Sequence, residues 1–271
     1  MNKFTGLKIY TFFIIGVLLL VSSCDDKSDD NGPDPDQDPV SLDLEITRGT
    51  VEDIDGNVYE TVIIGGQEWM AENLMTTHYN DGTPIVFPGG NNDIWLSNTS
   101  GAYNWYNDAE SNKDYYGAVY NWHAVTNTAR LCPDGWRVPS NIDWSQLVDY
   151  LTVTYSLSND QNDVGGIGNR LKSCRQVRSP LGVGCLTTIH PRWNGHDNHY
   201  GFDDFGFSAL PIGSLESDYI SDPGAYGRWW STSASNDDVV SAFTYYITYD
   251  NGRLFNNTRP KTNGYAVRCV R

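Results

Sequence analysis

The first 24 residues determine the compartment in which the rest of the chain must fold. Lys3 and Lys8 give the amino terminus a positive charge, and residues 9–21 form an almost entirely apolar run. This order of charged and apolar residues is typical of a signal peptide. A membrane-spanning helix needs about 20 consecutive apolar residues, whereas this run is shorter and is followed by two serines and Cys24. We therefore expect residues 1–23 to be removed and the remainder to be exported.

The segment from Val21 to Cys24 resembles the bacterial lipobox, in which the cysteine becomes the new amino terminus and carries two acyl chains. Two chains anchor a protein stably where one does not, because each buried methylene contributes about 0.8 kcal/mol. We expect Cys24 to hold the protein on a membrane. The alternative is an ordinary secreted protein with a stray cysteine at its cleavage site.

An acidic tether follows the anchor and covers residues 24–45. Residues 25–39 contain seven Asp, three Pro and one Lys, a composition that favours a solvated chain without a core. The aspartates also resemble the signal that carries some bacterial lipoproteins to the cell surface. We therefore expect an outer-membrane lipoprotein that faces outward, with a plain spacer and a periplasmic location as alternatives. Residues 46–271 are expected to form one domain.

Charge and cysteine content narrow the partners and the covalent structure. The formal net charge of −16 disfavours nucleic acid and anionic lipid headgroups as partners. Once Cys24 is lipidated, four cysteines remain: Cys132, Cys174, Cys185 and Cys269. An even number in an oxidising compartment predicts two disulfides. Their spacing leaves all three possible connectivities open.

The middle of the chain predicts one strand and two helices. Residues 57–64 are apolar on both faces, as in a buried strand. Ser140 can cap a helix whose apolar residues 144, 147, 148 and 151 follow the helical period. A weaker helix is expected at residues 168–172.

The carboxyl end predicts more strand. Residues 243, 245, 247 and 249 are apolar and occupy one face of a predicted strand. Asn251-Gly252 is a strong two-residue hairpin signal, so residues 253–256 are expected to form the antiparallel return strand. A last strand is expected at residues 265–270. The fold class is therefore α+β, with a small antiparallel sheet, one or two helices and long ordered loops.

Several strings in this order resemble the Fibrobacter succinogenes major paralogous domain, known as FISUMP. They lie at residues 53–59, 64–74, 120–122, 131–140, 205–211, 230–232 and 267–271. The resemblance implies a C-type-lectin-like architecture. It also implies a bridge between Cys132 and Cys269, which leaves Cys174 and Cys185 to close a local loop. The family has no defined biochemical role, so the resemblance implies a fold and a location rather than an activity.

The sequence gives no enzyme signature. It has no phosphate loop and no His-Glu-x-x-His pair, and residues 206–210 lack the second glycine of a nucleophile elbow. Residues 53–57 fit a hairpin turn better than a calcium loop, and the calcium-binding triplets of C-type lectins are missing. His196 and His199, with Asp197 between them, are the best candidate metal ligands, although such a pair in a polar loop usually binds nothing. We expect no cofactor and no metal.

Aromatic side chains are the best candidates for ligand contact, because they stack on sugar rings as well as filling cores. The candidates in the Gly-rich and Asp-rich loops are Trp193, Tyr200, Tyr219, Tyr226 and Trp229, joined by His196, Asp197 and His199. The leading hypothesis is a non-catalytic adhesion module for an extracellular glycan or protein. The alternatives are an oxidase-type or hydrolase-type enzyme, and a structural component of a surface assembly such as a pilus tip.

The lipid anchor is directly testable. The substitution Cys24→Ala should abolish metabolic labelling of the protein with a fatty acid, because the acyl chains attach through this thiol. The variant should also remain unprocessed or become soluble. Labelling that persists in the variant would refute the anchor.

Overall fold

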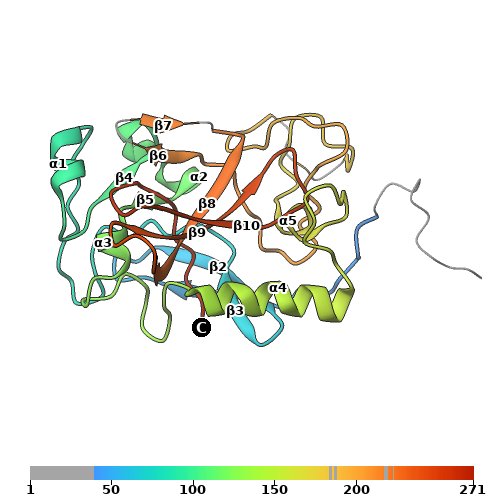
Figure 1. Cartoon of the computed structure of the whole chain (residues 1–271), viewed down its shortest axis with the longest axis horizontal. Coiled ribbons are helices and arrows are strands. Elements are labelled where there is room, and N and C mark those ends of the chain that lie inside the picture. Colours follow the sequence, from blue (N-terminus) through green and yellow to red (C-terminus); the bar gives the residue numbers. More distant parts are fainter. Residues whose placement is uncertain (1–39, 183–184, 186–187, 217–218, 222) are drawn as a thin grey trace, which may run out of the picture. The chain divides into compact units, whose positions relative to one another are not determined.

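The computed structural model describes residues 40–182, 185, 188–216, 219–221 and 223–271 (Figure 1). The predicted signal peptide, the lipidated Cys24 and most of the predicted tether lie outside the described residues. Within the described part of the chain, no helix combines the length and apolar character needed to cross a membrane.

All the strand pairs are antiparallel, and they form small sheets. One sheet has the order β1-β2-β3, a second has the order β10-β9-β8, and β4-β5 and β6-β7 form two-stranded pairs. The strands are β1 (Arg48–Glu52), β2 (Val58–Ile64), β3 (Gln67–Met70), β4 (Tyr103–Trp105), β5 (Ala118–Tyr120), β6 (Ser214–Glu216), β7 (Tyr219–Ser221), β8 (Tyr226–Ala234), β9 (Ser241–Thr248) and β10 (Phe255–Pro260).

The helices are mostly short. They are α1 (Asn92–Ser97), α2 (Lys113–Tyr116), α3 (Trp122–Val125), α4 (Asn141–Tyr155) and α5 (Ile167–Leu171), with single 3-10 turns η1 (Tyr106–Asp108) and η2 (Glu110–Asn112). Small antiparallel sheets with few helices confirm the predicted mixed α and β class.

Helix α4 begins where the sequence predicts. The Ser140 hydroxyl accepts from the backbone N–H of Asp143, whose carboxylate accepts in return from the Ser140 N–H at 2.8 Å. This reciprocal capping satisfies two backbone donors that the first turn leaves unpaired. Trp144, Leu147 and Leu151 are fully buried along one face. The predicted short second helix corresponds to α5.

The turn between β1 and β2 is also confirmed as a hairpin. The Asp53 carboxylate accepts from the backbone N–H groups of Asp55 and Asn57, and from the hydroxyl of Tyr59 at 2.5 Å. These bonds fix the conformation of the turn. The prediction that β2 is buried on both faces is wrong, because Val58 is 56% exposed. The neighbouring strands β1 and β3 form backbone hydrogen bonds with both edges of β2, but they leave one face of the strand exposed to solvent.

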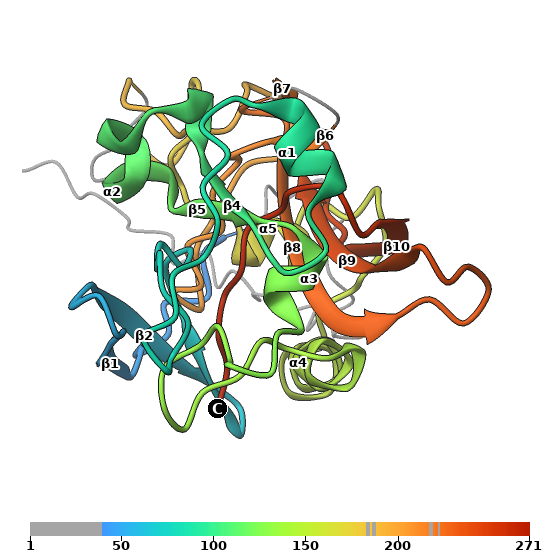
Figure 2. The ribbon, with the colours of Figure 1, turned by 90° about the vertical axis from the view of Figure 1, so that its left-hand side faces the viewer.

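The end of the chain is an extended buried segment rather than the predicted regular strand. Residues 265–270 all have relative exposures of 0%. Single bridges join Ala266 to Trp229 on β8 and Val270 to Trp69 on β3. Figure 2 shows this segment running between the sheet of β2 and the layer formed by β8 and α4. The segment therefore connects the two three-stranded sheets.

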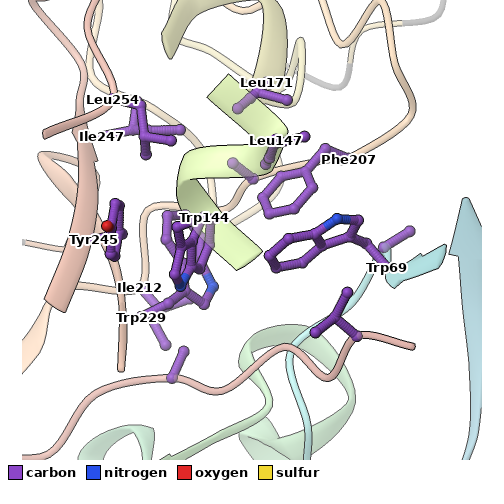
Figure 3. Close-up of a cluster of buried hydrophobic side chains, with 14 of the residues drawn as sticks. Trp69, Trp144, Leu147, Leu171, Phe207, Ile212, Trp229, Tyr245, Ile247 and Leu254 are labelled. Carbon is purple, nitrogen blue, oxygen red and sulfur yellow. The ribbon is translucent and has the colours of Figure 1, made fainter. Parts of the chain in front are cut away.

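One aromatic cluster fills the space between these elements (Figure 3). The rings of Trp69 and Trp144 have centroids 4.8 Å apart, and Trp144 stacks on Tyr245 at the same distance. Phe207 meets Trp69 and Trp229 edge-on. The cluster joins β3, α4, β8 and β9, so the aromatic side chains of the family-like strings mostly form core.

The connection from β9 to β10 is longer than the two-residue hairpin predicted at Asn251-Gly252. Residues 249–254 form the loop. The Gly252 N–H donates to the Gln161 carbonyl, and the Gly252 carbonyl accepts from the Gly168 N–H at 2.7 Å. The loop is therefore shaped by contacts with α5 and the turn before it, and these tertiary contacts override the local turn preference.

The start of the described chain lies against the domain. Leu42 and Leu44 pack on the core, and the Ser41 hydroxyl donates to Asp204 at 2.6 Å. The prediction that the disordered tether extends to residue 45 is therefore wrong for residues 40–45, because leucines and a serine in this segment find partners on the folded part.

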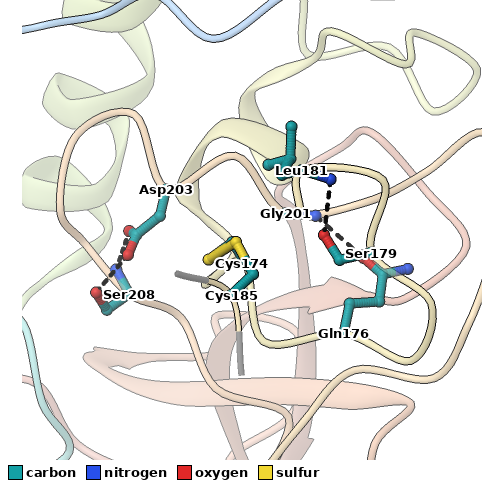
Figure 4. Close-up of a disulfide and its surroundings, with 8 residues drawn as sticks. All are labelled: Cys174, Gln176, Ser179, Leu181, Cys185, Gly201, Asp203 and Ser208. Carbon is teal, nitrogen blue, oxygen red and sulfur yellow. Dashed lines mark hydrogen bonds between the residues drawn. A yellow bond between two sulfur atoms is a disulfide. The ribbon is translucent and has the colours of Figure 1, made fainter. Parts of the chain in front are cut away.

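Two disulfides cross-link the domain. Cys132 is bonded to Cys269 and Cys174 to Cys185, which are the pairs that the family resemblance implies. The first attaches the end of the chain to the segment before α4, and both of its cysteines are buried. The second closes a local loop (Figure 4). Both pairings confirm the sequence-based prediction.

The two bridges should contribute unequally to stability. The chain-entropy model gives about 5 kcal/mol for the loop closed by Cys132 and Cys269, against about 3 kcal/mol for the shorter loop. Replacing both long-loop cysteines by Ala should therefore lower the free energy of unfolding by about 2 kcal/mol more than replacing Cys174 and Cys185. Denaturant titration of the two double variants measures this difference, and an equal loss would contradict it.

Candidate binding groove

The structure places two of the predicted platform residues in the core. Trp193 and Trp229 are both 0% exposed. The Trp193 indole N–H donates to the Ala209 carbonyl at 3.1 Å, and that of Trp229 donates to the Asn73 side-chain oxygen at 2.9 Å. The prediction that these rings present a contact face is wrong, because both indoles pack inside the buried aromatic core.

The remaining loop candidates divide between interior and surface. Tyr200 is buried and its ring packs on Phe202, so it is not a platform either. The side chain of Tyr219 lies outside the described residues. Tyr226 is half-buried at the start of β8, and Asp197 is exposed.

The histidine pair is close together but shows no metal site. The rings of His196 and His199 have centroids 5.0 Å apart, and His196 Nδ1 accepts from the backbone N–H of His199. His199 is buried, and its Nδ1 lies 3.0 Å from the Asn169 side-chain nitrogen. Among the described residues, no group of three or more His, Cys, Asp or Glu side chains could hold a metal ion.

Burial also changes the protonation of His199. Burial, together with the neighbouring cation Lys172, lowers the pKa of His199 to about 4. The imidazole is therefore neutral at physiological pH. Lys172 is itself fully buried beside it, where its Nζ donates to the carbonyls of Thr248 and Tyr249.

A groove with a volume of about 350 Å³ lies on the face of the C-terminal sheet that carries Tyr226, Arg228 and Tyr246. We call it the sheet groove. Most of its lining residues lie on strands β8, β9 and β10 and on the short strand β6. Figure 1 shows where these strands lie. Its lining residues are Ser214, Glu216, Tyr226, Arg228, Tyr246, Thr248, Asp250, Asn251, Phe255 and Arg259.

Strand register brings these residues together. Tyr226 is opposite Thr248, and Arg228, Tyr246 and Phe255 form one row across the three strands. Side chains alternate between the faces of a strand, so these residues share the face opposite Trp229 and Tyr245. One face of the sheet therefore packs on the aromatic cluster of Trp144, while the other lines the groove near Tyr226 and packs on a second core around Trp230 and Tyr265.

Arg228 is the central cation of the groove and is only 4% exposed. Its guanidinium carbon lies 4.1 Å from the ring centroid of Tyr246 and 5.4 Å from that of Tyr265. Its Nη1 donates to the Thr244 hydroxyl and to the Asn257 side-chain oxygen. The two rings and the two hydrogen bonds fix its position, and burial lowers its pKa.

Aromatic rings form part of the wall. Tyr246 stacks on Phe255 with centroids 5.0 Å apart and an interplanar angle of 13°. Tyr226 approaches Tyr246 at 6.4 Å. All three rings are half-buried, so each keeps some surface for a ligand.

Sequence reasoning missed most of this site. It used the face of residues 243–249 that carries Tyr245 and overlooked the face that carries Tyr246. The alternation of side chains in residues 226–234 and 255–260 could have indicated this second face. Arg228, Asn257 and Arg259 all lie on that face of their strands. Only Tyr226 was among the predicted contact residues.

The sequence matches the family model described as Fibrobacter succinogenes major domain over residues 62–271. Comparisons with curated proteins and with solved structures found no match. The match covers the sheet groove, the helix α4 and the buried terminal segment.

The environment of His199 predicts that the stability of the folded protein depends on pH. The folded pKa is about 4, below the value of about 6.5 for an unperturbed imidazole. Between these values the unfolded chain binds more protons, so acid favours unfolding. The stability of the wild type relative to His199→Gln should therefore fall as the pH falls from 6.5 to 4.

Denaturant titration at several pH values measures this difference. The substitution of an exposed histidine, His190→Gln, is the matched control. A difference between wild type and His199→Gln that stays constant over this pH range would contradict the assignment.

Proposed function

This chain belongs to the Fibrobacter succinogenes major domain family, and from that premise we propose that it is a non-catalytic binding or adhesion module. The sheet groove is its contact site, and an extracellular glycan or protein is its ligand. The observation that carries the proposal is the groove itself, in which half-buried rings lie beside fixed hydrogen-bonding groups. Pockets of this kind orient a ligand through a few polar groups while apolar surfaces supply contact area.

The proposed setting is the cell surface. The lipobox-like segment and the acidic tether support an outer-membrane anchor at Cys24, with the domain outside the cell. A bound molecule would then contact many anchored copies at once. Multivalent contact increases adhesion without requiring a strong single site.

The C-type-lectin-like architecture is part of the same proposal. A helix beside small antiparallel sheets supports it, as does the bridge from the segment before α4 to the end of the chain. Function does not follow from such an architecture alone. The proposal therefore rests on the groove.

The rings of the groove provide the test. The double substitution Tyr226→Ala with Phe255→Ala should weaken binding at least about tenfold, because exposed aromatic anchors dominate binding energies. The assay displays many copies of the full chain to a glycan array and a panel of matrix proteins. The control is Tyr115→Ala with Phe87→Ala, which removes two partly exposed rings outside the groove.

Two results would contradict the proposal. Equal binding by the wild type and the groove variant would move the contact site elsewhere. Chemical conversion of a bound ligand, detected by mass spectrometry, would identify an enzyme.

A further inference from the structure

Two arginines, Arg228 and Arg259, line the sheet groove. Arg228 and Arg259 form no salt bridge with any acidic side chain in the described residues. The bonds of Arg228 within the protein go to neutral oxygens of Thr244 and Asn257. A buried cation is normally paired with an anion. The groove therefore holds positive charge that the described part of the domain does not neutralise by direct pairing.

Two further polar atoms in the groove have no partner. Thr248 is 8% exposed, and its hydroxyl oxygen makes no hydrogen bond in the described structure. The Nε of Arg259 is buried and is also without a partner. Buried polar groups are nearly always satisfied. Both atoms belong to residues that line the sheet groove, so a ligand bound there is a candidate source of their partners.

The anion that fits best is a carboxylate. A guanidinium offers its N–H groups as a planar fork that matches the two oxygens of a carboxylate. Rings hold Arg228 on two sides, so its orientation is set before a ligand arrives. Little side-chain freedom is lost when such a preorganised group binds.

The rest of the lining favours a saccharide as the carrier of this carboxylate. Glu216, Asp250 and Asn251 provide oxygens that accept hydrogen bonds from hydroxyl groups. Tyr226 and Phe255 offer apolar ring surface that can stack on the C–H face of a sugar. The two carboxylates balance the two arginines, so the groove does not attract every polyanion equally.

We propose that the sheet groove binds a saccharide that carries a carboxylate, with Arg228 and Arg259 pairing with that group. This inference rests on the proposed function and specifies its ligand. Thr248 donates to a sugar oxygen, and Glu216 and Asp250 accept from sugar hydroxyls. The rings of Tyr226 and Phe255 lie against the sugar.

The test uses the full chain, immobilised at high density, and three uronate polymers: polygalacturonate, alginate and hyaluronate. Each is compared with its carboxyl-reduced form, in which the acid becomes a neutral alcohol. At least one native polymer should bind about tenfold or more tightly than its reduced form, because a charge-assisted pair is lost. Polyglutamate, which has carboxylates without sugar rings, should bind more weakly than that polymer.

Variants locate the site. Arg259→Gln should reduce binding of the native polymer about tenfold and leave the reduced form unaffected. The control Arg130→Gln removes an equal charge from a surface ion pair outside the groove. It should change the binding of neither the native nor the reduced polymer. Arg228→Lys keeps the charge but loses the planar fork, and it should weaken binding while circular dichroism stays that of the wild type.

The outcomes separate the two proposals. If native and reduced polymers bind equally, and the variant Tyr226→Ala with Phe255→Ala binds neither, the ligand does not need a carboxylate. The proposal that the groove is a binding site would still stand. Equal binding of polyglutamate would overturn the saccharide. Failure of all three uronates to bind would overturn this inference, while groove-dependent binding of another ligand on the panel would still support the module.

Discussion

Arg268 carries a charge into the centre of the molecule, and the arrangement of the surrounding elements follows from satisfying it. Its guanidinium donates to the carbonyls of Phe207 and Ser208 and to the Asn73 side-chain oxygen. The same oxygen accepts from the indole of Trp229. A buried cation without such acceptors would cost several kcal/mol. The burial of the terminal segment therefore requires that segments distant in the sequence meet around Arg268.

This buried segment also determines the groove. Ala266 is bridged to Trp229 on β8, and Tyr265 lies under Arg228 on the opposite face of that strand. The disulfide at Cys269 holds the segment from its other end. The groove therefore rests on a segment that is fixed at both ends. A rigid scaffold with a polar, aromatic cavity suits selective binding, since the ligand does not have to order the site.

Local features were predictable because their causes are local. The Ser140 cap and the apolar period after it identify α4, and Asp53 organises the β1–β2 turn through its nearest neighbours. Family resemblance, rather than spacing, supplied the pairing of Cys132 with Cys269. The hairpin at Asn251-Gly252 failed for the converse reason, because distant groups near α5 hold that loop.

The sequence by itself determined the α+β class, the main helix, the family and the expectation of export. Tertiary structure alone decided which aromatic rings are buried and which line the sheet groove. Trp193 and Trp229 lie in polar loops or strands that look exposed, yet both are buried, whereas Tyr246 and Phe255 line the groove. The physical reason is that the side chains of a strand or loop point to more than one side, and only packing against the other elements determines which of them are buried.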